Sequence, residues 1–296
     1  GYYDVADAVG IYSYAYLYGS SILNTGSIFA SATSQGAAHA TGIATNSYDG
    51  DSVIQNFGDV SADAISLGGA YGAAVATGVR VERESGKYNL PDLTLVNHGD
   101  ITATATRSGD RGYASARGTY VNAMYAALYN YGNIAAVAAS DAQGYSMAIA
   151  VGSSTFGKYG VIEVNDGSIS AISSVGNGGS SKSLALVADA AYGEMVVTNH
   201  GDIFAGSISR FDGPYGGRAY SLGVSIHSEY AVDLYNSGSI SAEASAEHGS
   251  AEANAVVAQG KYGVATLVNN GDISASADAY AGYASATGSD MSSKYG

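Results

Sequence analysis

The chain lacks cysteine and tryptophan and is poor in proline and in positive charge. Its 296 residues include 2 Pro, 12 Lys plus Arg and 26 Asp plus Glu, which gives a formal net charge of −14. This balance argues against nucleic-acid binding, because phosphates are neutralised by clustered Lys and Arg. It also lacks the run of roughly 18 apolar residues that a membrane-spanning helix needs. The absence of cysteine is compatible with both the cytosol and many bacterial surface proteins.

Glycine and tyrosine are the residues in excess, with 41 Gly and 25 Tyr. Abundant glycine alone would suit a disordered linker, but 46% hydrophobic residues favour an ordered core. Collagen is excluded because the glycines have no triplet period and proline is scarce.

One motif, Asn-x-Gly-x-(Ile/Val)-x-Ala, recurs eight times at intervals of 32 to 41 residues. Such self-similarity is the signature of a repeat architecture. The asparagines that anchor the repeats are Asn24, Asn56, Asn97, Asn130, Asn165, Asn199, Asn236 and Asn269. The repeats average about 35 residues and cover the whole chain. We therefore expect residues 1–296 to form one continuous domain.

Within each repeat the hydrophobic pattern has a period of two, which predicts strands and not helices. Aliphatic residues stand four after the Asn and Ala six after it. Two residues before the Asn, seven of the eight repeats have an aliphatic residue and the eighth has Glu163. The Asn and Gly between the two strands are typical of a sharp corner, because both tolerate left-handed backbone dihedrals.

These repeats predict an all-β fold, a parallel β-helix (β-solenoid) of about eight repeats. Stacked turns pair their strands in register and close a core that one repeat cannot form. Alanine at the inward positions predicts a narrow interior. The corner asparagines are expected to form a ladder of side-chain amide hydrogen bonds that fixes the register. The pattern allows one or two turns per repeat, and a right-handed crossover is the better expectation.

The tandem Asn-x-Gly-x-Ile-x-Ala strands resemble the passenger regions of bacterial autotransporters and related large β-helical surface adhesins. The resemblance spans essentially the whole chain and its motifs are specific to architecture. It implies an extended β-helix displayed outside the outer membrane, hence an extracellular location on a bacterial cell surface.

Two inserts interrupt the repeats, at residues 79–92 and 209–218, and each contains one of the two prolines. We expect both to be solvated loops and the first places to look for specific binding. Their charge clusters are Glu82, Arg83 and Glu84 in the first insert and Arg210, Asp212 and Arg218 in the second, and the prolines are Pro91 and Pro214.

Two further sets of residues are candidate sites. The acidic corner residues Asp59, Asp100, Asp202 and Asp272 are weak candidates for a calcium ladder, against the plainer interpretation that they stabilise turns. The tyrosines Tyr159, Tyr192, Tyr230, Tyr262 and Tyr295 recur at about the repeat length. They are expected to form a stripe of stacked rings, either for stability or as an interaction surface for glycans or neighbouring filaments.

The sequence contains no catalytic motif, and we expect no enzyme activity and no cofactor, with calcium as the one alternative. The primary hypothesis is a non-enzymatic extracellular structural or adhesive rod. Its partners would be a host or glycan surface, further copies of itself stacked head to tail or laterally, or the continuation of a longer chain. The alternative hypothesis is a carbohydrate-binding or polysaccharide-degrading β-helix of the tailspike or lyase kind, which would need carboxylates converging on one face.

Overall fold

The computed structural model describes residues 4–16, 18–68, 72–83, 92–141, 146–210 and 216–295. These residues form 21 β-strands and no helix, and each strand pairs in parallel with the equivalent strand of the next turn. The all-β parallel solenoid expected from the repeats is confirmed. Within the described ranges there is accordingly no helix with the length and apolar character to cross a membrane.

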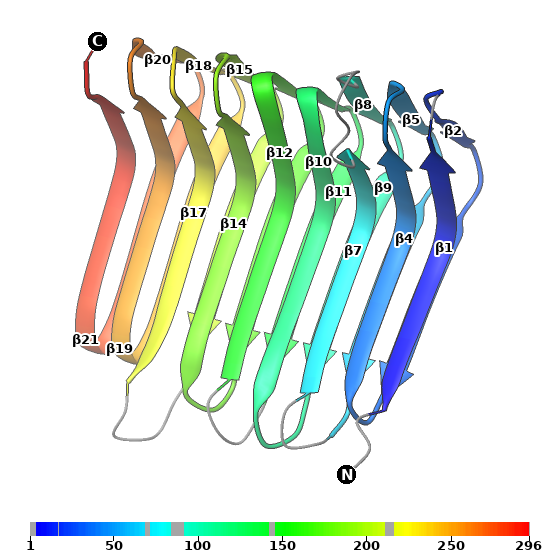
Figure 1. Cartoon of the computed structure of the whole chain (residues 1–296). Helices are drawn as coiled ribbons and strands as arrows, with labels where there is room; N and C mark the ends of the chain where they lie inside the picture. The colour runs from blue at the N-terminus through cyan, green and yellow to red at the C-terminus, as the bar shows by residue number, and fades with distance from the viewer. Residues whose placement is uncertain are drawn as a thin grey trace.

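Each turn contains three strand positions, joined by corners (Figure 1). The first position is occupied by β1 (Val5–Ala15), β4 (Ala37–Ser47), β7 (Gly72–Arg83), β14 (Gly179–Ala190) and β17 (Gly217–Ser228). The second is occupied by β2 (Ser21–Asn24), β5 (Ser52–Asn56), β8 (Asp92–Asn97), β15 (Glu194–Asn199), β18 (Val232–Asn236) and β20 (Ala265–Asn269). The third is occupied by β3 (Ile28–Ser34), β6 (Val60–Ser66), β9 (Asp100–Arg107), β11 (Asn133–Ser140), β13 (Ser168–Val175) and β16 (Asp202–Ser209).

Four longer strands run through a corner and fill two positions each. The first and second positions merge in β10 (Gly112–Asn130) and β12 (Ser146–Asn165). The third position merges with the first position of the following turn in β19 (Ser239–Gly260) and β21 (Asp272–Ser293). The pairing between β10 and β12 shifts register between Ala123 and Tyr125, where the two positions meet.

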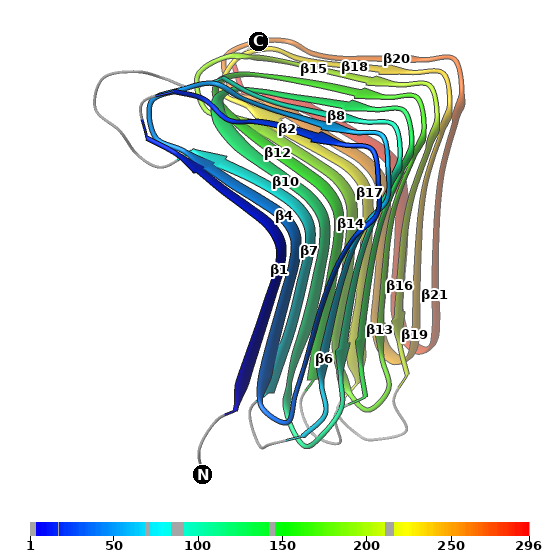
Figure 2. The same cartoon turned by 90° about the vertical axis from the view of Figure 1, so that its right-hand side faces the viewer.

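The pairing register shows that one repeat makes one turn. Val5 pairs with Ala37 and Asn56 pairs with Asn97. The extra residues of the longer repeats therefore lie in the segments that connect the strands. Seen from the N-terminal end, the chain rises along β1, crosses along β2 and descends on the opposite side while moving away from the viewer (Figure 2). This coil is right-handed, as the crossover preference suggests.

The interior narrows toward the edge at which the third strand of a turn leads into the next (Figure 2). Alanines fill this narrow part: Ala74 and Ala76 on β7 and Ala103 and Ala105 on β9 are all buried. Larger aliphatic side chains such as Ile54 and Leu95 fill the wider part. The expected narrow interior is therefore present at one side of the cross-section.

The corner glycines are required for close packing, and the expectation of left-handed dihedrals at these positions is wrong. Among the described residues, positive φ occurs only at Gly109, Gly112, Gly178, Gly179, Gly249 and Gly282, which are not corner glycines of the motif. A Cβ on Gly132 would instead overlap the backbone carbonyl of Gly99 in the turn before. A corner stacked on a preceding turn thus leaves no room for a side chain, whereas the corner of the first turn, at Gly26, does.

Both inserts begin or end within a strand, so the loops are shorter than the ranges 79–92 and 209–218 expected from the sequence. Residues 79–83 continue strand β7, and Arg83 donates a hydrogen bond to the sulfur of Met124 in the next turn. Ser209 ends β16, and Gly217 and Arg218 begin β17. Of the remaining insert residues, Glu84, Pro91, Asp212 and Pro214 lie outside the described residues.

The corner packing predicts different costs for the same substitution in different turns. Gly132→Ala forces its new Cβ against the Gly99 backbone, and we expect a loss of about 1–3 kcal/mol in the free energy of unfolding. Gly26→Ala is the matched control, because nothing lies within 4 Å of the position of its Cβ. Urea unfolding of both variants measures the difference, and equal losses would contradict the steric explanation.

Candidate functional site

The corner asparagines form a continuous hydrogen-bonded ladder through all eight turns. In every step the side-chain Nδ2 of one Asn donates to the Oδ1 of the Asn in the next turn, and the first seven asparagines are buried. The bonds are Asn24 to Asn56 (2.7 Å), Asn56 to Asn97 (2.8 Å), Asn97 to Asn130 (2.8 Å), Asn130 to Asn165 (2.8 Å), Asn165 to Asn199 (2.7 Å), Asn199 to Asn236 (2.8 Å) and Asn236 to Asn269 (2.7 Å).

The ladder also satisfies its own ends. In the first turn the backbone N–H of Gly26 donates to the Oδ1 of Asn24 at 3.2 Å. In the last turn the Nδ2 of Asn269 donates to the carbonyl of Gly271 at 2.9 Å. Since its buried amide groups are paired along the column, the ladder is a structural device and offers little to a ligand.

The four acidic corner residues do not assemble into a metal site. Asp100 accepts a hydrogen bond from Asn133 at 2.8 Å, and Asp202 accepts one from Ser239 at 2.5 Å, each from the following turn. Asp202 and Asp272 are separated by Ser239 in the column. Across the described part of the chain, no three His, Asp or Glu side chains are grouped closely enough to hold a metal ion. The carboxylates of Asp100 and Asp202 instead cross-link neighbouring turns at the surface.

The predicted tyrosine stripe is present as two separate groups. Tyr159 contacts Tyr192 with ring centroids 6.3 Å apart, while Tyr262 contacts Tyr230 at 6.5 Å and Tyr295 at 5.5 Å. All five residues are described, and no ring contact joins Tyr192 to Tyr230. Only the contact between Tyr262 and Tyr295 is stacked, with an interplanar angle of 13°, and the others are tilted.

A second aromatic column was not anticipated. Phe57, His98 and Tyr131 each follow a ladder asparagine, and their rings stack at 4.7 Å with interplanar angles of 5° and 11°. The signal is visible in the sequence, because three consecutive repeats have a ring at the position after the Asn. This column and the ladder occupy the same corner, so both stabilise the stacking there.

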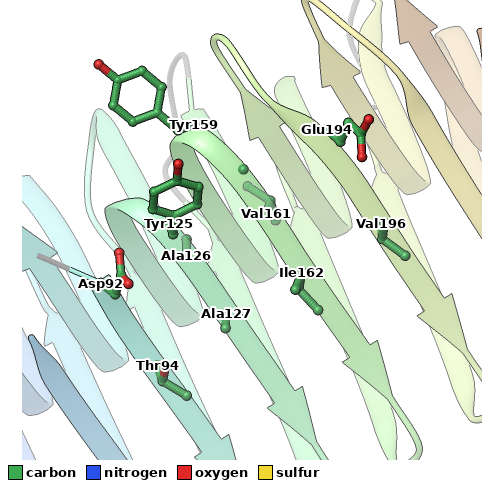
Figure 3. Close-up of a pocket in the computed structure, with 11 residues that line it drawn as sticks. Asp92, Thr94, Tyr125, Ala126, Ala127, Tyr159, Val161, Ile162, Glu194 and Val196 are labelled. Carbon is green, nitrogen blue, oxygen red and sulfur yellow. The ribbon is translucent and has the colours of Figure 1, made fainter. Parts of the chain in front are cut away.

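A surface depression lies over the second-position strands of the middle turns (Figure 3). It has a volume of about 490 Å³, within the range of small-molecule sites. Its lining residues are Asp92, Thr94, Tyr125, Ala126, Ala127, Tyr159, Gly160, Val161, Ile162, Glu194 and Val196. They come from β8, β10, β12 and β15, with Tyr159 and Gly160 in the bend of β12. Of these residues, the sequence points to Tyr159 through the tyrosine stripe and to Asp92 as the last residue of the insert 79–92.

Gly160 gives the depression its depth. Tyr125 pairs with Asp92 on one side and with Gly160 on the other, and Gly160 pairs with Glu194, so the four residues stand in one column along the axis. The other three members of the column have side chains, and Gly160 leaves a gap among them. A Cβ at Gly160 would lie 3.4 Å from the ring of Tyr125, so the ring lies against the bare backbone.

Carboxylates border the depression at both ends (Figure 3). Burial, reinforced by the nearby Asp51, raises the pKa of Asp92, and the backbone N–H of Asp92 donates to Asp51 at 2.9 Å. Glu194 is exposed at the opposite end. The lining contains no Lys or Arg. The site therefore combines aromatic and aliphatic surface with hydrogen-bond acceptors.

Two charged residues lie inside the solenoid at positions that other turns fill with uncharged side chains. Arg107 is fully buried at the end of β9, where its guanidinium donates to the carbonyl of Arg111 at 2.8 Å. Burial lowers the pKa of Arg107. Glu163 is also fully buried, between Leu128 and Val197 of the neighbouring turns. Neither faces the depression.

Burial raises the pKa of Glu163 from 4.5 to about 7, although a hydrogen bond from Ser153 at 2.8 Å acts in the opposite direction. The folded chain therefore holds a proton on Glu163 at pH values where the unfolded chain has released it. This makes Glu163 a stability determinant inside the rod.

The ladder predicts that two Asn→Ala substitutions in the same turn lower the free energy of unfolding by different amounts. Asn130→Ala removes the buried acceptor of Asn97 Nδ2 and the buried donor to Asn165 Oδ1, and we expect a loss of roughly 2–4 kcal/mol in the free energy of unfolding. Asn133→Ala also removes two bonds between turns, but its side chain is exposed, so the expected loss is under about 0.5 kcal/mol. Denaturant unfolding compares them, and similar losses would refute a special role of the buried ladder.

The buried carboxyl predicts that stability falls as the pH rises from about 4.5 to about 7. In this window the folded state binds a proton that the unfolded state does not, and the resulting loss is about 3 kcal/mol, complete above pH 7. Glu163→Gln removes this contribution. Burial also raises the pKa of Asp63 and Asp189, so the difference between the two proteins is the quantity to measure. An unchanged slope in the variant would contradict the assignment.

The candidate features are thus of two kinds, the columns that hold the turns together and one depression that departs from them. The chain shows no match to a known protein family, to a curated protein or to a solved structure.

Proposed function

We propose that this protein is a non-enzymatic structural or adhesive rod of a bacterial cell surface. The observation that carries the proposal is the uninterrupted Asn ladder, which links eight turns in register without a break. At the usual spacing of parallel strands these turns span about 40 Å along the axis. A rod of this kind presents the same architecture along its whole length and displays side chains at fixed intervals.

An extracellular location is part of the same proposal. Its support is the resemblance of the Asn-x-Gly-x-Ile-x-Ala strands to autotransporter passengers and β-helical adhesins. The low share of charged residues and the many exposed tyrosines favour contact with another surface over catalysis on a dissolved substrate.

The strands of the terminal turns provide a route to assembly. The strands β1, β2 and β3 at one end and β20 and β21 at the other pair on one side only. Unpaired strand edges associate readily with another edge. We include head-to-tail association of copies in the proposed function, because a parallel solenoid extends by adding turns in register.

A polysaccharide-degrading activity is the weaker alternative. Hydrolytic pairs of carboxylates lie about 5–10 Å apart. Asp92 and Glu194 border the same depression, but their strands are three pairings apart, which is about 14 Å of backbone separation. This spacing favours contact with a ligand over attack on one of its bonds.

Electron microscopy of the purified chain tests the rod and its assembly. We expect filaments with an axial repeat of about 40 Å. Ala8→Lys places a charge on the inward side of the exposed first turn and should shorten or abolish them, because inward charges blunt a strand edge. Val9→Lys, on the outward side of the same strand, is the control and should not. Discrete monomers of the unmodified chain would contradict both head-to-tail assembly and the rod, because one chain spans about 40 Å along the axis and the 11 residues of β1 span about 36 Å across it.

A further inference from the structure

The depression between Asp92 and Glu194 offers a flat aromatic platform to a ligand. The ring of Tyr125 is 54% exposed and leans toward Tyr159, with centroids 5.9 Å apart and an interplanar angle of 41°. Both rings rise above the strands on the same side of the depression (Figure 3). An exposed ring of this kind stacks against another flat, partly apolar surface.

The remaining side of the depression is aliphatic. Thr94, Ala127, Ile162 and Val196 stand in a second column, each paired with the next, along the strands beneath the rings. Ile162 is 47% exposed and adds apolar surface to this column. A ligand that fits here therefore contacts carbon on its long side and carboxylate oxygens at its ends.

Charge selects among ligands of that shape. The lining includes two carboxylates, one basic group stands beside it, Lys158 with its Nζ 5.2 Å from the ring centroid of Tyr159, and the whole chain has a net charge of −14. An anionic ligand would be repelled. The carboxylate oxygens accept hydrogen bonds only, so the ligand must bring donors such as hydroxyl groups.

We propose that this depression binds a short uncharged oligosaccharide that lies along the solenoid axis. A sugar ring presents a face of C–H groups to Tyr125 and hydroxyl donors to Asp92 and Glu194. The ends of the site are about 14 Å apart, so they suit a chain of several sugar rings better than a single ring. The proposal rests on the adhesive function proposed above and names the chemistry of its partner.

An organic amine is the competing occupant, since rings and carboxylates also attract ammonium groups. The two carboxylates stand at opposite ends of the column, with Tyr125 and Gly160 between them. They therefore do not enclose one ammonium together. The elongated shape with separated acceptors favours the sugar.

The experiment uses the full chain and a panel of soluble tetrasaccharides, namely maltotetraose, cellotetraose, mannotetraose and chitotetraose, with spermidine as the amine probe. Binding is measured by ligand-observed NMR and by isothermal titration. We expect at least one tetrasaccharide to bind at millimolar concentration. Tyr125→Ala should weaken its binding about tenfold, whereas Tyr125→Phe should retain it.

Gly160→Val fills the depression and should abolish binding of the tetrasaccharide. Ala231→Val is the matched control, because Ala231 occupies the same column beyond the depression and Val264 follows it in the next turn. Asp92→Asn and Glu194→Gln should each weaken binding. Circular dichroism and the filaments seen by electron microscopy show whether each variant keeps its fold.

The proposal is overturned if no tetrasaccharide binds, if spermidine binds more tightly than every sugar, or if Gly160→Val leaves sugar binding unchanged. In these cases rods in the micrographs would leave the structural role standing. Conversely, sugar binding by a chain that forms no rods would overturn the rod and keep the site. The two failures are therefore distinguishable.

Discussion

The whole structure depends on stacking in register. Every turn must place its corner Asn within hydrogen-bonding distance of the Asn before and after it, and the seven observed distances vary only from 2.7 to 2.8 Å. A slip of one residue would turn every inward side chain outward. The ladder, the bare corner glycines and the alternating strands therefore enforce one another, and variation is permitted only where it does not disturb them.

The loops and the outer faces are where such variation is found. Repeat lengths between 32 and 41 residues are tolerated because extra residues leave and rejoin the strands at the corners. On the outer face, the column Asp92, Tyr125, Gly160 and Glu194 changes size at every step and charge at its first and last steps, while the backbone pairing continues. The depression arises from this variation, because Gly160 has no side chain in a column whose other members have one.

The fold could be predicted from the sequence because its motif recurs in every turn. The depression could not, because it occurs in one place and no repeated pattern marks it. Eight copies of one motif predicted the parallel solenoid and the ladder asparagines. The corner glycines were predicted correctly but for the wrong reason, since a neighbouring carbonyl excludes their Cβ while their φ values are ordinary. The depression depends on which outward residues become neighbours across four turns. That adjacency requires the register of each pair, including the shift at Ala123, which no spacing in the sequence reveals.

The burial of Glu163 in the interior was likewise not predictable from the sequence. The sequence identified it as the one polar residue at an aliphatic position, but not whether the turn would expose or bury it. The structure buries it fully between Leu128 and Val197, and the cost appears as a pKa raised to about 7. A solenoid can tolerate such a residue because its stability is a sum over many turns, each held by its neighbours. For the same reason a small residue such as Gly160 can open a depression in one turn while the other turns keep the solenoid stable.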